Sequence, residues 1–128
     1  MVTYDIKEIM DELTNLYNQK DFDKLINAGN YYIKKNICYD VIYNIMGIAF
    51  HHLKEYDNSI QYFKKSINLN PKFAEAYNNM GYSLRSKGNL DLAIVNHRKA
   101  LTLKDNFVDA LVNLGFCLSQ KKEFDLAL

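Results

Sequence analysis

The side chains that could carry out catalysis or hold a metal are few, and their spacing keeps them apart. His51 and His52 are adjacent, so on a helix their side chains diverge by about 100° and do not chelate one ion. His97 falls at an aromatic packing position, which favours a hydrogen-bonded core histidine over a catalytic base. The sequence also lacks a glycine-rich phosphate loop and the HExxH, GxSxG and paired-cysteine motifs. We therefore predict no catalytic centre, no cofactor and no metal site.

The two cysteines indicate an environment rather than a reaction. Cys38 and Cys117 lack the spacing of a redox or zinc motif, and both lie in apolar stretches. Buried free thiols are therefore expected, which favours a reducing compartment and a cytoplasmic location. The first ten residues include Asp5 and Glu8 where a secretory leader would be apolar, and no apolar run approaches membrane-spanning length. We expect no insertion into a membrane.

Recurring carboxamides and aromatic rings suggest binding instead. Asn79 and Asn113 are one repeat apart, and each offers a donor and an acceptor that could hold successive amides of an extended peptide. The sequence leaves open that asparagine is merely frequent at this position. Tyr82 and Phe116 have the same offset and would supply apolar anchors, although packing at the core or the rim explains them equally well.

The overall charge argues against nucleic acid as a partner. The chain has 128 residues, of which 48% are hydrophobic and 24% charged, and its net charge is +1. This composition is that of a folded globular domain, but it supplies no basic field that would gather phosphates. A protein or peptide partner is expected.

A period of 34 residues organises these side chains. FAEAYNNMGYSLRSKGNLDLAI from Phe73 aligns with FVDALVNLGFCLSQKKEFDLAL from Phe107, and CYDVIYNIMGIAFHHLKEYDNSI from Cys38 has the same register. Apolar residues recur at helical spacing in each copy, without strand-like alternation. Each copy is therefore predicted to contain two amphipathic helices.

Aspartates and glycines at equivalent positions refine this prediction. The aspartates are expected to be N-caps of the second helices, because a carboxylate accepts hydrogen bonds from the free amides of the first turn; they are Asp23, Asp57, Asp91 and Asp125. Gly47, Gly81 and Gly115 each cost about 1 kcal/mol inside a helix relative to alanine. Close helix packing is the expected compensation.

These features resemble the tetratricopeptide repeat, a 34-residue unit with the pattern W-x2-L-G-x2-Y, then A-x3-F, then proline. One copy matches this pattern at Tyr43, Met46, Gly47, Phe50, Ser59, Phe63 and Pro71. The next copy matches at Tyr77, Met80, Gly81, Leu84 and Ala93, and the last at Leu111, Leu114, Gly115 and Leu118. The resemblance implies an all-α fold, a solenoid in which antiparallel helix pairs stack into a right-handed superhelix.

Four segments follow from this register. Residues 1–39 are expected to be a degenerate first repeat that acts as an N-terminal cap, residues 40–73 and 74–107 whole repeats, and residues 108–128 an incomplete repeat. The sequence stops within the predicted second helix of the last copy. We therefore expect either a piece of a longer array or a chain whose last helices pair with a second copy to form a homodimer.

In such arrays the first helix of each copy lines a concave surface, so the resemblance implies a peptide-binding groove there. The candidate groove residues are Asn44, Ile48, His51, Asn78, Asn79, Tyr82, Arg85, Asn113, Phe116 and Gln120. FAEAYNNMG is also similar to segments of O-linked N-acetylglucosamine transferases, whose repeats carry an asparagine ladder. The predicted function is a scaffold that binds a protein or peptide segment in this groove.

Two alternatives remain at this point: the substrate-recognition arm of a larger, glycosyltransferase-like enzyme, and a helical-repeat RNA binder. A carboxylate clamp for chaperone tails is disfavoured. Repeat proteins with that clamp place Lys, Asn, Asn, Lys and Arg at positions that here hold Met10, Thr14, Ile45, Glu75 and Asn79.

Overall fold

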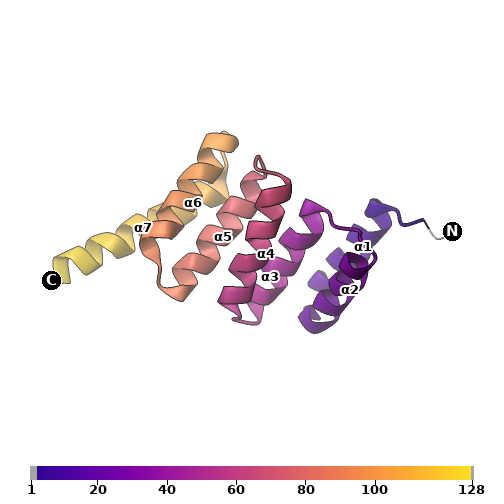
Figure 1. The fold of residues 1–128 in the computed structure, drawn as a ribbon. Coiled ribbons are helices and arrows are strands. Elements are labelled where there is room, and N and C mark those ends of the chain that lie inside the picture. The colour runs from indigo at the N-terminus through magenta and orange to yellow at the C-terminus, as the bar shows by residue number, and fades with distance from the viewer. Residues whose placement is uncertain (1–2, 128) are drawn as a thin grey trace. The chain divides into compact units, whose positions relative to one another are not determined.

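The computed structural model describes residues 3–127, in which all regular structure is helical. The helices are α1 Ile6–Asn18, α2 Phe22–Lys34, α3 Asp40–His52, α4 Tyr56–Leu69, α5 Ala74–Lys87, α6 Leu90–Leu103 and α7 Val108–Ala127 (Figure 1). The chain divides into two compact units, Met1–Leu69 and Asn70–Leu128, which we call the first and second unit. Each is described by itself.

In the first unit, α1 packs against α2 and α3 packs against α4, and α1 also contacts α3. Leu13, which stands where the repeat pattern has glycine, is fully buried in the core beside Leu25 and Met46. The close packing expected at Gly47 is confirmed, since a Cβ atom there would lie 2.6 Å from Cε1 of Phe63. The degenerate first copy is therefore a complete helix pair with a larger residue at the helix contact.

In the second unit, α5 packs against α6, and both contact α7. Close packing is confirmed at Gly81, where a Cβ atom would lie 2.7 Å from Cε1 of the buried His97 ring. Phe107 and Ala110 join Ala74 and Ala100 in a small core cluster. This cluster fixes the start of α7 beside α5.

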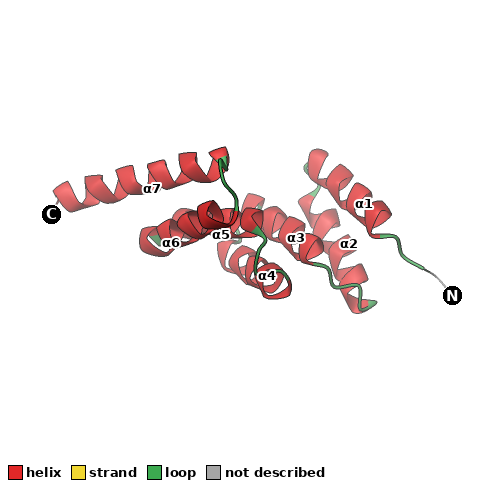
Figure 2. Cartoon of the chain, turned by 90° about the horizontal axis from the view of Figure 1, so that it is seen from above, coloured by secondary structure: helices red, strands yellow, loops and turns green. Residues whose placement is uncertain are grey.

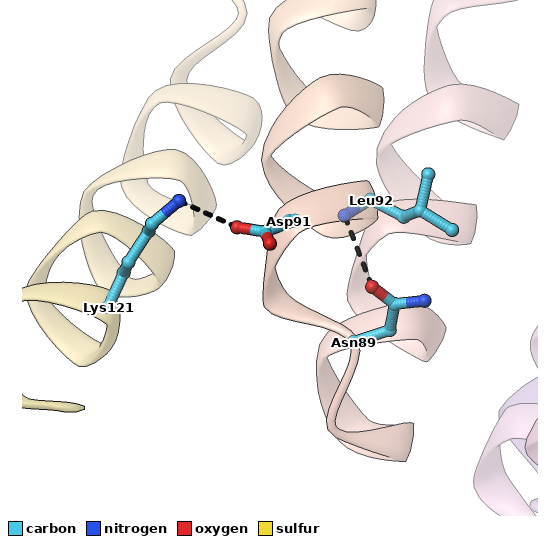
Figure 3. A network of polar contacts seen from close by, with 4 residues as sticks. All are labelled: Asn89, Asp91, Leu92 and Lys121. Carbon is cyan, nitrogen blue, oxygen red and sulfur yellow. Dashed lines mark hydrogen bonds and ion pairs between the residues drawn. The ribbon is translucent and has the colours of Figure 1, made fainter. Parts of the chain in front are cut away.

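The N-caps lie two residues before the positions predicted from the sequence. The Asp21 carboxylate accepts from the backbone N–H of Lys24 at 3.3 Å. The Asn89 carboxamide accepts from the backbone N–H of Leu92 at 3.3 Å (Figure 3). Asp23, Asp57 and Asp91 lie in the first turn instead. The left-handed residues Lys20, Lys54 and Gly88 reverse the chain early, so each second helix begins before its aspartate. The carboxylates still suit the positive end of the helix dipole.

The prediction of a separate second helix capped by Asp125 is wrong, because α7 continues without a break to Ala127 (Figure 2). The repeat equivalent of Lys20, Lys54 and Gly88 is Lys122, which here is helical. A left-handed conformation costs a lysine roughly 1–2 kcal/mol, and residues 118–127 are exposed, so no packing offsets that cost. Close packing at Gly115 is absent too, since no described atom outside its own helix lies within 4 Å of a Cβ built there.

The predicted burial of the cysteines is half right. Cys117 is fully buried, whereas Cys38 is exposed. Cys38 lies in the connection between α2 and α3, where its thiol donates to the carbonyl oxygen of Ile33 at 3.9 Å. Its neighbour Ile37 packs against the core of the first unit, whereas Cys38 and Tyr39 stay at the surface.

Candidate functional site

A pocket of about 310 Å³ lies between α5 and α7 in the second unit. Its lining residues are Asn78, Asn79, Tyr82, Asp109, Val112 and Asn113. On each helix one lining residue lies three and four residues from the other two, so the three residues border one face. The pocket is thus formed by matching faces of two neighbouring helices, and most of its polar atoms are carboxamides.

Asn78 forms the floor of the pocket and links it to the core. Its side chain is 6% exposed, and its Oδ1 lies 2.8 Å from Nδ1 of His97 and accepts from Nδ2 of Asn113 at 3.1 Å. Since a carboxamide oxygen only accepts, His97 carries its proton on Nδ1. The network connects α6, α5 and α7 and holds the Asn113 carboxamide in place.

His97 stays neutral in this environment. Burial, with a smaller contribution from the positive charge of Arg85, lowers the pKa of His97 from 6.5 to about 4. Its Nε2 is buried without a hydrogen-bond partner among the described residues. The sequence-based expectation of a hydrogen-bonded core histidine is confirmed.

Next to the pocket residue Tyr82, a cation contacts two aromatic rings. The Arg85 guanidinium carbon lies 4.9 Å from the Tyr82 ring centroid and 5.5 Å from that of Phe116. Tyr82 and Phe116 are 39% and 55% exposed, so both rings also reach solvent. The sequence predicted all three residues for the groove but not their mutual contact.

The structure thus brings six of the ten predicted groove residues together in the second unit: Asn78, Asn79, Tyr82, Arg85, Asn113 and Phe116. Asn78 differs from the prediction in being mostly buried, as the floor of the pocket rather than an open surface group. Gln120 lies further along α7 and lines another pocket with Glu123, Phe124 and Ala127.

The other three predicted residues belong to the first unit. Asn44, Ile48 and His51 lie on α3 and are half-buried. The His51 ring packs 5.3 Å from that of Tyr56, centroid to centroid, and 6.0 Å from that of His52. His52 is exposed but stacks on Phe22 at 4.7 Å, so these two histidines are engaged by aromatic neighbours.

Two pocket residues, Asp109 and Val112, were not among the predicted ones. Both are exposed on α7, four and one residues before Asn113. Helical spacing could have found them stepwise, because Asp109 lies four residues before Asn113 and Val112 lies three residues after Asp109. Asp109 adds a negative charge at one side of the pocket.

Within residues 3–127 no group of three or more His, Cys, Asp or Glu side chains is arranged to hold a metal ion. In the same part of the chain, no helix combines the length and the apolar character needed to cross a bilayer.

Comparison with known proteins identifies the repeat. Residues 41–73 match one model of the tetratricopeptide repeat, and residues 62–95 match a second model of the same repeat. No curated protein matches the chain at a significant level.

Solved tetratricopeptide-repeat domains have the same fold. The Sgt2 domain from Aspergillus fumigatus superposes with a TM-score of 0.87 at 12% identity, over 93% of this chain and 80% of that one. The Arabidopsis OM64 domain gives 0.84 at 22% identity, over 89% and 94% of the two chains. The first such domain of Spaghetti (RPAP3), solved with the HSP90 peptide SRMEEVD, gives 0.84 at 17% identity, over 89% and 90%. The predicted all-α tetratricopeptide-repeat solenoid is confirmed as the fold class.

Proposed function

Because this chain contains tetratricopeptide repeats, we propose that it is an interaction module that binds an extended segment of a partner protein in the pocket between α5 and α7. The ligand backbone lies over Asn79 and Asn113, and its side chains contact Tyr82 and Phe116. The chain performs no chemistry on the ligand in this proposal.

The observation that supports this function best is the pairing of three carboxamides with apolar surface in one pocket. Peptide bonds need both donors and acceptors, and asparagine supplies both. Asn113 gives one N–H to Asn78, which orients the rest of its carboxamide without using its oxygen. A site prepared in this way loses little side-chain entropy when a ligand binds.

The ligand differs from the acidic chaperone peptide that the Spaghetti (RPAP3) domain binds at its own site. Of the positions that would clamp a terminal carboxylate, Ile45 is buried in the core, Met10 is half-buried, and Glu75 is already paired with Lys104 at 2.8 Å. The Lys104 ammonium holds the pKa of Glu75 below its ordinary value, so this side chain is a carboxylate at neutral pH. It would repel a ligand carboxylate.

A selection from random peptides tests the proposal and needs no identified partner. Peptides of 12 residues displayed on phage are selected against the chain, and the enriched sequences are then measured by fluorescence anisotropy. We expect the variant Asn79→Ala/Asn113→Ala to weaken the selected peptides about tenfold or more, since each lost neutral hydrogen bond is worth about 1 kcal/mol.

The matched control is Asn27→Ala/Gln61→Ala, which removes two exposed carboxamides from α2 and α4 and is expected to leave affinity unchanged. Peptides that bind the chain and the Asn79/Asn113 variant equally would place recognition elsewhere and contradict the proposal. Equal unfolding curves for all three proteins confirm that the variants are folded.

A further inference from the structure

Arg85 is a half-buried cation. Among the described residues, no carboxylate forms an ion pair with it and no acceptor takes a hydrogen bond from it. Its described neighbours are the faces of Tyr82 and Phe116, which attract a cation but accept none of its five N–H groups in the plane of the guanidinium. The side chain is therefore held in place while its N–H groups remain available to solvent or to a ligand.

The charge of Arg85 acts on the core behind it. It lowers the pKa of His97, and it opposes the rise that burial causes in the pKa of Cys117. Both groups are fully buried and neutral, so neither compensates the guanidinium. The last turn of α5 also carries Lys87, so the helix dipole has a second cation there.

We propose that Arg85, clamped between Tyr82 and Phe116, is a subsite for a carboxylate, and that the ligand of the pocket carries an aspartate or glutamate side chain at that point. This inference rests on the proposed peptide-binding function and adds a chemical class to the ligand. A planar guanidinium binds a carboxylate through two parallel hydrogen bonds, and aromatic walls beside it reduce competition from water.

The charge of Asp109 affects which ligand residues are favoured beside it. It lines the pocket together with the carboxamides and has no ion-pair or hydrogen-bond partner among the described residues. A second acidic side chain on the ligand is disfavoured there by like charge, whereas a lysine, an arginine or a free N–H is favoured. The ligand is therefore a segment with a single acidic residue at the Arg85 side, followed across the carboxamides by neutral or basic residues.

The test uses the same display of 12-residue peptides against the full chain and against Arg85→Gln. We expect one position of the peptides selected by the unaltered chain to be Asp or Glu, and this preference to disappear with Arg85→Gln.

A selected peptide, synthesised with an amidated C-terminus, should bind roughly tenfold more weakly when its acidic residue is changed to the amide, because hydrogen bonds to charged groups are worth more than neutral ones. With Arg85→Gln the two peptides should bind alike.

Arg98→Gln is the matched control, since it removes an exposed arginine from α6 in the same unit and should keep the acidic preference. A second readout is the pKa of His97 by NMR, which should rise on binding of the acidic peptide as the carboxylate neutralises Arg85, and stay constant with the amide peptide.

Different results would contradict the Arg85 subsite and the peptide-binding function. Peptides that depend on Asn79 and Asn113 but show no acidic position, or whose amide form binds equally well, overturn the Arg85 subsite and leave the peptide-binding function intact. Selection of peptides by a free C-terminal carboxylate alone, seen when amidation abolishes binding, overturns it as well. If no selected peptide depends on the asparagines, the proposed function itself is contradicted.

Discussion

At the scale of single residues, a phenyl ring in one repeat and an imidazole ring in the next occupy the same position and pack in the same way. Phe63 and His97 are 34 residues apart, and each ring covers the glycine of the preceding helix, Gly47 or Gly81. The imidazole adds a hydrogen bond to Asn78 that the phenyl ring cannot make. In the second unit, the hydrogen bond between His97 and Asn78 therefore links the core to the pocket. Protonation of the buried His97 opposes folding.

This link makes stability depend on pH. Well above pH 6.5 His97 is neutral in the folded and unfolded chains and contributes no pH dependence. As the pH falls from 6.5 towards 4, the unfolded chain takes up a proton that the folded chain does not, so the free energy of unfolding decreases by up to about 3 kcal/mol. His97→Phe should remove this component, as measured by urea unfolding at several pH values. An unchanged slope in the variant would assign the pH dependence to other groups.

The equivalent glycines Gly81 and Gly115 lead to opposite predictions. Alanine at Gly81 places a methyl group 2.7 Å from the buried His97 ring, and overpacking of this kind costs about 1–3 kcal/mol. Alanine at Gly115 meets nothing within 4 Å and should stabilise α7 by up to about 1 kcal/mol through helix propensity. Chemical denaturation of both variants measures the difference, and a stabilising Gly81→Ala would show that the ring is free to move.

At the scale of helices, the left-handed residue of each turn decides where a helix ends. Lys54 has a φ of 62° between α3 and α4, whereas its equivalent Lys122 is inside α7. Lys54→Gly should therefore raise the free energy of unfolding by about 1 kcal/mol, since glycine adopts positive φ without strain.

Lys122→Gly should do the reverse, because glycine inside a helix costs about 1 kcal/mol relative to alanine. Faster amide hydrogen exchange after residue 118 would be its signature. If Lys122→Gly instead slowed exchange there, the end of α7 would already form a turn in solution.

At the scale of the whole molecule, pairing of two copies through the last helices stays a prediction. Val108, Leu111 and Leu118 are exposed on α7, and burying such side chains favours association. We expect the sedimentation coefficient to rise with concentration, and Leu111→Ser/Leu118→Ser to reduce this rise. Leu92→Ser/Val95→Ser, which alters exposed apolar residues of α6, is the control. A chain that is monomeric at every concentration would contradict the pairing.

The sequence by itself determined the period, the helical class and the two close helix contacts at Gly47 and Gly81. These are periodic or local constraints, because a glycine inside an amphipathic helix indicates a neighbouring side chain where a partner helix forms. This holds at Gly47 and Gly81 but not at Gly115. It also placed Asn79, Tyr82, Asn113 and Phe116 on helix faces that meet, since equal offsets in a repeat return to equivalent positions.

Only the tertiary structure decided which of two adjacent asparagines is buried and where Arg85 lies. Asn78 and Asn79 are alike in the sequence, but they point about 100° apart on the helix, and the distance between α5 and α6 brings only Asn78 to His97. Arg85 lies between Tyr82 and Phe116 because α7 runs beside α5. Contacts of this kind depend on the separation of whole helices, which is set by the summed packing of many side chains and by no single motif.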